Sequence, residues 1–286
     1  MTALAARIAG AFTAACRDEL GAPKPGNVHV FADGHRMTAA DFLRSADAAA
    51  GPLTMPGARV GARILGAVEA TFKAVGTNTN LGIILVCAPL AAAAERYTGD
   101  LRTALAPVLD GLDVEDALLA FRAIARASPG GLGRIARHDV HAPATVTLKE
   151  AMAEAAAHDR IARQYVTTFA DVFEQGLPTL EQALPRIDAK WATLAVYLEF
   201  LVTFPDTHIV RKYGVPAAEA VRATAAQFRD RIAANKPPDE LLSALLAWDA
   251  DLKARHVNPG TSADLTVATL FARGLRNVLP SSRNNG

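Results

Sequence analysis

Apolar residues recur every three to four positions along nearly every long segment of this 286-residue chain, and no segment alternates convincingly between apolar and polar residues. This spacing builds one apolar face on an α-helix, whereas a half-buried strand requires alternation. The sequence therefore predicts an all-α fold with no sheet beyond an incidental hairpin. We expect about ten helices, over residues 2–20, 38–51, 58–75, 82–97, 113–127, 147–175, 188–204, 215–235, 238–256 and 262–279.

The composition agrees with close-packed helices. Apolar residues make up 51% of the chain but aromatic residues only 6%, so small and aliphatic side chains carry most of the apolar content. No long linker and no internal repeat at solenoid spacing divides the sequence. We therefore expect one compact multi-helix domain over residues 1–286.

Charge and hydropathy exclude two classes of partner. Thirty basic residues against 29 acidic ones give a net charge of +1, so no charge excess points to nucleic acid or to an anionic membrane. The longest nearly unbroken apolar run, residues 81–94, falls short of the ~20 residues that cross a bilayer. The start of the chain resembles a secretory signal only superficially, because Arg7 follows apolar residues. With only Cys16 and Cys87, we expect a cytoplasmic protein without disulfides.

Four polar loops hold more functional groups than a turn needs, and the first two suit anions. Lys24, Gly26, Asn27 and His29 lie on a proline-stiffened backbone, where a cation, an amide and an imidazole suit a group such as phosphate. The second loop brings its polar groups to the N-terminus of an apolar helix, a natural site for an anion or polar ligand. Its candidate binding residues are Asn78, Thr79 and Asn80. Each loop taken alone also fits an ordinary turn or helix cap.

The third loop combines a carboxylate, an imidazole and two cations within seven residues. Asp206 can hold a magnesium ion or accept a proton. The planar guanidinium group of Arg211 can bind two oxygens of a phosphate at once. His208 and Lys212 complete this set. A helix-terminal loop with surface ion pairs explains the same residues without a ligand.

The fourth loop leads through a Pro-Gly turn into the last predicted helix. Its candidate binding residues are Asn258, Gly260, Ser262 and Asp264. An acidic residue in the first turn of a helix is favourable with the helix dipole even without a ligand. Capping alone therefore explains this loop, and only the four loops together indicate a shared site.

In this order, five short motifs resemble the ATP:dephospho-CoA triphosphoribosyltransferase family, also called triphosphoribosyl-dephospho-CoA synthase. The motifs are PKPG from residue 23, a helix with Asp41, Phe42 and Ser45, NTxxG from residue 78, DTxxxR from residue 206, and PGxSADL from residue 259. The resemblance extends from about residue 20 to 270, which is most of the chain.

The resemblance implies an all-helical enzyme in which a hydroxyl of dephospho-CoA attacks the anomeric carbon of ATP and adenine leaves. Such a site must neutralise a triphosphate with magnesium and cations, stabilise an oxocarbenium-like centre and remove a proton. The resemblance implies ATP as substrate and small-molecule partners. It also implies a Mg²⁺ ion, for which Asp206 is the candidate ligand, and it leaves open whether the protein forms a homo-oligomer. The candidate catalytic residues are Asp41, Asp206, His208 and His29, and Ser45 joins the loop residues at the nucleotide.

The sequence departs from the family pattern at its second motif. Asn80 and Leu81 stand where the family usually has a histidine and a lysine, which removes a cation. The segment before Gly176 also looks more like the family branch found in methanogens and methylotrophs, so a cofactor precursor of a one-carbon-carrier pathway remains an alternative acceptor. Two further alternatives are a metal-dependent nucleotide phosphohydrolase, for which the chain has an adjacent His-Asp pair at residues 138–139, and a non-catalytic nucleotide-binding protein.

Overall fold

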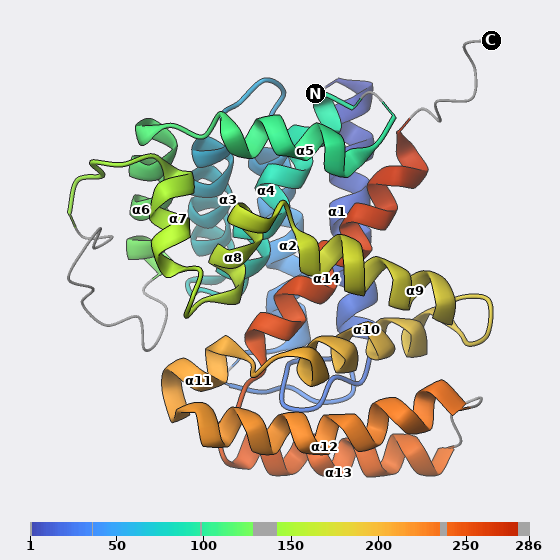
Figure 1. Ribbon diagram of the computed structural model, residues 1–286. Coiled ribbons are helices and arrows are strands. Elements are labelled where there is room, and N and C mark those ends of the chain that lie inside the picture. The colour runs from blue at the N-terminus through green and yellow to red at the C-terminus, as the bar shows by residue number, and fades with distance from the viewer. Residues whose placement is uncertain (1, 36, 98, 128–141, 235–238, 280–286) are drawn as a thin grey trace.

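The computed structural model describes residues 2–35, 37–97, 99–127, 142–234 and 239–279 (Figure 1). In these ranges the chain forms fourteen α-helices and one π-helical turn, and no strand beyond isolated bridges at residues 29–37. The all-α prediction is confirmed. The elements are α1 (Ala3–Gly21), α2 (Ala39–Leu53), α3 (Val60–Val75), α4 (Leu81–Glu95), α5 (Leu101–Asp110), α6 (Val114–Ala127), α7 (Leu148–Ala155), α8 (Arg160–Thr167), the π-turn η1 (Asp171–Gly176), α9 (Leu177–Ala183), α10 (Ala189–Thr203), α11 (Thr207–Tyr213), α12 (Val215–Ala234), α13 (Asp239–Ala254) and α14 (Gly260–Val278).

The prediction of about ten helices is wrong for two reasons. Three short helices, α5, α9 and α11, lie where the sequence analysis placed none. The single helix predicted over residues 147–175 is divided, because Asp159 accepts the N–H groups of Ile161 and Ala162 and so begins α8 anew. At the other end, Thr168 and Phe169 adopt left-handed φ angles of 49° and 55°, which no α-helix continues through.

Helix α4 forms the centre of the larger hydrophobic core. Thirteen of its 15 residues are buried, which is the pattern of a helix surrounded on all sides. It packs against α3, α5 and α14, so the apolar run of residues 81–94 serves as core. Among the described helices none is both long and apolar enough to cross a membrane.

A second apolar cluster lies around α10, α12 and α13 at the bottom of Figure 1. Phe228 of α12 stacks on Trp248 of α13 with ring centroids 5.2 Å apart. Helix α14 contacts both α4 and α10, and therefore joins the two clusters. The expectation of a single domain stays a prediction.

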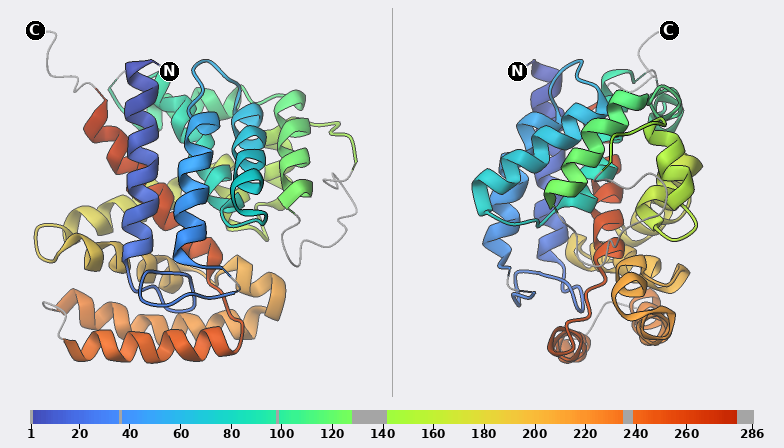
Figure 2. Two further views of the ribbon diagram at one scale, coloured as in Figure 1. Left: turned by 180° about the vertical axis from the view of Figure 1, so that it is seen from behind. Right: turned by 90° about the vertical axis from the view of Figure 1, so that its left-hand side faces the viewer.

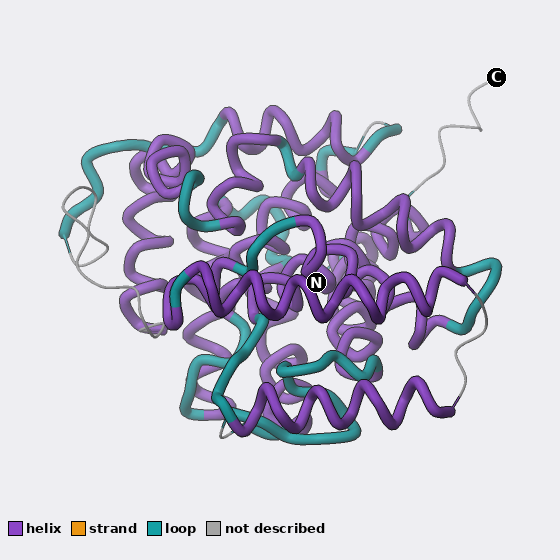
Figure 3. The backbone as a smooth tube through the Cα atoms, turned by 60° about the horizontal axis from the view of Figure 1, so that its bottom comes forward, coloured by secondary structure: helices purple, strands orange, loops and turns teal. Residues whose placement is uncertain are grey.

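The polar loops lie where these two parts of the fold meet. The described loop residues 22–35 and 37–38 lie between the lower ends of α1 and α2 and the pair α12 and α13, as the view from behind and the tilted view show (Figures 2 and 3). Helix α11 and the first turn of α14 meet at the same level, because α11 packs on both α12 and α14. The fold thus brings loops that are far apart in sequence to one region.

Candidate functional site

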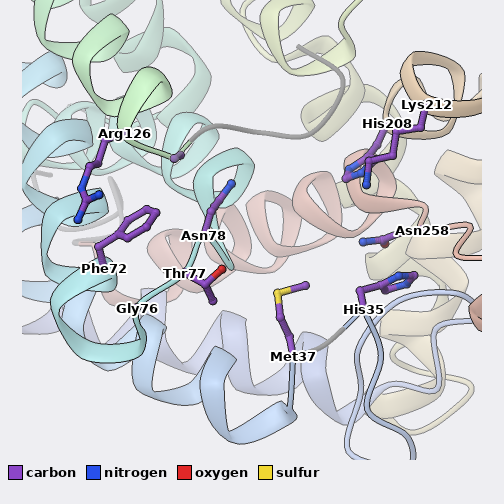
Figure 4. Close-up of a pocket in the computed structure, with 11 residues that line it drawn as sticks. His35, Met37, Phe72, Gly76, Thr77, Asn78, Arg126, His208, Lys212 and Asn258 are labelled. Carbon is purple, nitrogen blue, oxygen red and sulfur yellow. The ribbon is translucent and has the colours of Figure 1, made fainter. Parts of the chain in front are cut away.

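A cavity of about 540 Å³ lies in this region, and three of the four polar loops contribute to it. One wall comes from α3, α6 and the loop between α3 and α4; the other comes from α11 and the loops before α2 and α14 (Figure 4). The polar residues on the first wall are Thr77, Asn78 and Arg126, and on the second His35, His208, Lys212 and Asn258. None of the described lining residues is acidic, so the cavity suits an anion.

Lys24, which the sequence analysis offered as a phosphate-binding cation, does not line the cavity. Its side chain is fully buried, and its Nζ lies 2.8 Å from Glu19 Oε1 and donates to Asn27 Oδ1 at 3.1 Å and to the Val28 carbonyl at 2.7 Å. Burial lowers the pKa of Lys24, and the Glu19 carboxylate opposes that shift. An ammonium group has three N–H donors, so no donor of Lys24 remains for a ligand in this arrangement.

Lys24 nevertheless determines which end of the Asn258 amide faces the cavity. Because an ammonium only donates, the Asn27 oxygen must face Lys24, and its amide nitrogen then donates to Asn258 Oδ1 at 2.9 Å. That contact uses the Asn258 oxygen and leaves the Asn258 amide nitrogen, a donor, for the cavity (Figure 4). Lys24, Asn27 and Asn258 therefore form a relay that fixes a hydrogen-bond donor.

Asp249 holds the same loop from α13, and sequence reasoning missed it. Its Oδ1 accepts the Gly26 N–H at 2.8 Å, and its Oδ2 lies 3.3 Å from His29 Nε2 and 2.9 Å from Lys253 Nζ. Burial raises the pKa of Asp249, but the contacts with His29 and Lys253 outweigh it and the pKa falls below its usual value. The position stands among ordinary charged residues of a helix, so no signal in the sequence marks it.

Gly26 and His29 also stabilise the loop and do not line the cavity. Gly26 has a φ of 81°, and a Cβ on it would come within 2.8 Å of Pro259 Cδ. His29 is fully buried beside Asp249, and burial lowers its pKa. The Gly26 carbonyl lies 2.8 Å from His35 Nε2, so that nitrogen carries a hydrogen and His35, which the sequence analysis did not single out, is held at the cavity wall.

Asp206 lies just behind the second wall, and its carboxylate joins α11 to α14. Oδ1 accepts the N–H groups of His208 and Ile209 at 2.9 and 3.2 Å, and Oδ2 accepts both the N–H and the hydroxyl of Ser262 at 2.8 Å each. The burial of the group raises its pKa, and these bonds oppose the shift. A carboxylate has about four acceptor positions, and these four hydrogen bonds occupy them.

This arrangement positions His208 and Lys212 at the cavity. The His208 ring packs against Gly260, where a Cβ would come within 2.5 Å of its Nδ1, and its buried Nε2 has no hydrogen-bond partner among the described residues. Burial, with Arg211 and Lys212 nearby, lowers the pKa of His208 to about 3. The imidazole is therefore neutral at pH 7. Burial, and after it Arg211, also lowers the pKa of Lys212.

The second loop presents one further donor. Asn78 Oδ1 accepts the Leu81 N–H at 3.1 Å, which leaves the Asn78 amide nitrogen for a ligand. Thr79 instead donates to Ser45 Oγ at 2.6 Å, and Asn80 is buried at the start of α4. Leu81, which stands where the family has a lysine, is itself buried in the core.

Asp41 is not among the residues that line the cavity. Its carboxylate accepts the N–H and hydroxyl of Thr38 and pairs with Arg44, which is the capping box at the start of α2. These bonds from Thr38 lower its pKa. Ser45 donates to the Asp41 carbonyl. The roles proposed for both residues at a nucleotide stay predictions.

Asp264 differs from the other predicted carboxylates, because no hydrogen bond or ion pair holds it among the described residues. It lies in the first turn of α14 against Gly82, where any Cβ would overlap its Oδ2. Burial and the nearby carboxylates of Glu19, Asp206 and Asp159 raise its pKa well above the usual value. Arg211, whose Nη1 lies 3.5 Å from Asp159 Oδ2, opposes that shift.

Sequence reasoning missed Phe72 and Arg126, which lie on helices α3 and α6 with no motif around them. The guanidinium carbon of Arg126 lies 4.2 Å from the centre of the Phe72 ring. The His-Asp pair at residues 138–139 lies outside the described residues. In the described part of the chain no group of three or more His, Cys, Asp or Glu side chains forms a metal site.

Comparison with known proteins agrees with the motifs. Residues 5–283 match the family described as ATP:dephospho-CoA triphosphoribosyl transferase. The fold is similar to that of a proposed triphosphoribosyl-dephospho-CoA synthase from Archaeoglobus fulgidus, with a TM-score of 0.62, 24% sequence identity, and coverage of 80% of this chain and 96% of that one. At this identity the likeness shows the fold alone. No curated protein matches the chain significantly.

Proposed function

Because the chain belongs to the ATP:dephospho-CoA triphosphoribosyl transferase family, we propose that the cavity is where it binds ATP and transfers the triphosphoribosyl group to dephospho-CoA. In this reaction a hydroxyl oxygen of the acceptor bonds to the anomeric carbon of the ATP ribose. The bond from that carbon to adenine breaks, and the proton of the hydroxyl passes, through a basic group of the protein or through water, to the departing adenine. The protein is an ATP-dependent triphosphoribosyl transferase by family membership.

The observation that supports the cavity as the site is its charge. Two cations, Arg126 and Lys212, line the cavity, and no described lining residue is acidic. Two amides, Asn78 and Asn258, line it as well, and the oxygen of each already accepts a hydrogen bond, so that each offers its nitrogen. A substrate with three phosphates needs such donors, and its own charge compensates theirs. We assign the triphosphate to the second wall, where Lys212 and the Asn258 amide nitrogen converge, with Arg211 one residue before Lys212.

Asp264 is the carboxylate best placed for the charge on the reacting ribose. It lies against Gly82 at the start of α4, near the charges of Asp206 and Arg211, and no internal bond neutralises it among the described residues. Burial raises the pKa of Asp264, because it makes the anion unfavourable there. A positive charge developing on the anomeric carbon reverses this, so the carboxylate stabilises the transition state more than the ground state.

His208 is the candidate acceptor for the proton of the attacking hydroxyl. Its Nε2 is buried without a partner among the described residues, and the cations Arg211 and Lys212 help to keep its pKa low. A triphosphate bound at Lys212 neutralises part of that positive charge. The basicity of His208 therefore rises when ATP binds, which is when a base is needed. His29, buried against Asp249, supports the loop in this account.

Magnesium remains an expectation, and the described residues do not fit a resident ion held by Asp206. Both oxygens of Asp206 already accept two hydrogen bonds each, so direct coordination requires breaking them. We propose that the ion enters as the magnesium complex of ATP, where phosphate oxygens are its ligands. No step above depends on a metal ligand from the protein.

Product analysis tests the proposed function. The protein is incubated with ATP, Mg²⁺ and dephospho-CoA, and the products are separated by chromatography and mass spectrometry. Transfer predicts one free adenine for each dephospho-CoA that gains a triphosphoribosyl group. Release of phosphate without adenine identifies a phosphohydrolase, and binding of ATP without any product identifies a non-catalytic protein. Adenine that appears only with a different cofactor precursor would reassign the acceptor.

A further inference from the structure

The cavity carries a second cation on the wall opposite Lys212. Arg126, in the last turn of α6, lies over the Phe72 ring of α3 with its guanidinium carbon 4.2 Å from the ring centre. Figure 4 shows the two side chains together at one end of the cavity, while Lys212 and His208 lie at the other end. The residues between them, Thr77, Asn78 and Met37, bear no charge.

The stacking determines what Arg126 offers to a ligand. A guanidinium group is planar, so a ring against one face holds that plane while the N–H donors remain at its edges. Two parallel N–H groups at an edge match two oxygens of a phosphate. Arg126 is exposed at the cavity wall, and it is therefore a preorganised phosphate donor set rather than a flexible surface cation.

A transfer between two phosphorylated substrates requires two such positions. ATP and dephospho-CoA both carry phosphate groups, and the reacting carbon must lie between them. The Lys212 end has the Asn258 donor and the neutral His208, which fit the ATP triphosphate assigned there. The Arg126 end is thus left for the phosphates of the second substrate.

We propose that Arg126, held by Phe72, binds the diphosphate of the acceptor dephospho-CoA, separately from the ATP triphosphate at Lys212. This inference rests on the proposed function, because it names the acceptor of that reaction. It adds a specificity-determining residue that lies outside all five sequence motifs. It also predicts that the two substrates depend on different cations of one cavity.

Calorimetric titrations with dephospho-CoA and with ATP-Mg²⁺, each alone, test the assignment on four proteins. These are the wild type, Arg126→Gln, Lys212→Gln and the matched control Arg122→Gln, which alters an exposed arginine of the same helix that does not line the cavity. We expect Arg126→Gln to weaken dephospho-CoA binding at least tenfold and ATP binding less than twofold. Lys212→Gln should show the reverse, and Arg122→Gln neither effect. The thermal midpoint of each variant is recorded to exclude unfolding.

The results separate a failure of this inference from a failure of the proposed function. If the wild type binds dephospho-CoA and releases adenine, but Arg126→Gln leaves dephospho-CoA affinity unchanged, the inference is wrong and the function stands. If Arg126→Gln weakens ATP as strongly as dephospho-CoA, the Arg126 wall belongs to ATP and the inference is again wrong. If the wild type neither binds dephospho-CoA nor releases adenine with it, the proposed acceptor fails and this inference fails with it.

Discussion

The side-chain nitrogen of Asn27 donates to Oδ1 of Asn258 over 2.9 Å, although 231 residues separate the two in sequence. The buried Lys24 orients Asn27, and Asn27 in turn orients Asn258. A lysine of the PKPG motif thus acts on the ligand cavity without lining it. A fully buried ammonium group whose donors are all used can thus act on the proposed phosphate site through Asn258.

Asn27→Asp tests this relay with almost no change in shape. The new carboxylate still accepts from Lys24 but has no N–H to donate to Asn258. The Asn258 amide then turns, so that its oxygen faces the phosphate. We expect ATP affinity to fall about tenfold, which corresponds to about 1.4 kcal/mol. Calorimetry measures the effect.

A double-mutant cycle provides the control for the relay. If Asn27 acts through Asn258, then Asn258→Ala should weaken ATP binding in the wild type and add little in the Asn27→Asp background. Fully additive losses would show that the two amides act independently.

Asp206→Asn should reduce stability, because the carboxylate connects α11 to α14 through four hydrogen bonds. The amide nitrogen of the variant faces N–H donors and leaves at least one of them unsatisfied. We expect the free energy of unfolding to fall by about 2 kcal/mol, and by about 1 kcal/mol in Ser262→Ala, which removes only the hydroxyl bond. Denaturant unfolding measures both. Unchanged stability of Asp206→Asn together with loss of magnesium-dependent ATP binding would instead support Asp206 as a metal ligand.

Asp264→Asn should affect the chemical step and spare ATP binding. The amide cannot supply the negative charge that the reacting carbon needs, so we expect adenine release to slow by a factor of about 10²–10³. Gly82→Ala should act on the same group, because a Cβ at this position overlaps Asp264 Oδ2 and displaces it. Rapid-quench measurement of adenine with saturating substrates reports the step. Full activity in both variants would remove Asp264 from the reaction.

The low pKa of His208 predicts how stability depends on pH. The folded pKa of about 3 lies below the usual value of 6.5, so between these values the unfolded chain binds more protons. Stability from this group is therefore complete above about pH 6.5 and is lost as the pH falls towards 3. The slope reaches about 1.4 kcal/mol per pH unit for one proton.

His208→Asn measures that contribution directly. Urea unfolding of both proteins between pH 7 and pH 5 should give a flatter dependence for the variant, because the wild type alone carries this titration. His29 and His35, whose pKa values burial also lowers, are common to both proteins and cancel in the comparison. Parallel curves for the two proteins would contradict the low pKa.

The sequence predicts the fold class well because periodic apolar spacing is a local property, and α4 is buried along most of its length as its composition requires. It also locates loop residues that meet in space, since Asn78, His208, Lys212 and Asn258 all line one cavity. Polar density in loops is visible without a structure, because simple turns do not need it.

The remaining features depend on contacts between distant segments. Nothing near Lys24 indicates that Glu19, on the preceding helix, pairs with it in the interior. Arg126 and Phe72 are ordinary helix residues until α6 and α3 pack together. Helix α8 ends at Thr168 and Phe169, whose left-handed backbone has no signature in the sequence.

A crystal structure of the protein soaked with ATP and Mg²⁺ tests most directly whether this cavity binds ATP. We expect triphosphate oxygens within hydrogen-bonding distance of Lys212 Nζ and Asn258 Nδ2, with the ribose between the two walls. Nucleotide density bound elsewhere on the molecule, with this cavity holding only solvent, would contradict this expectation.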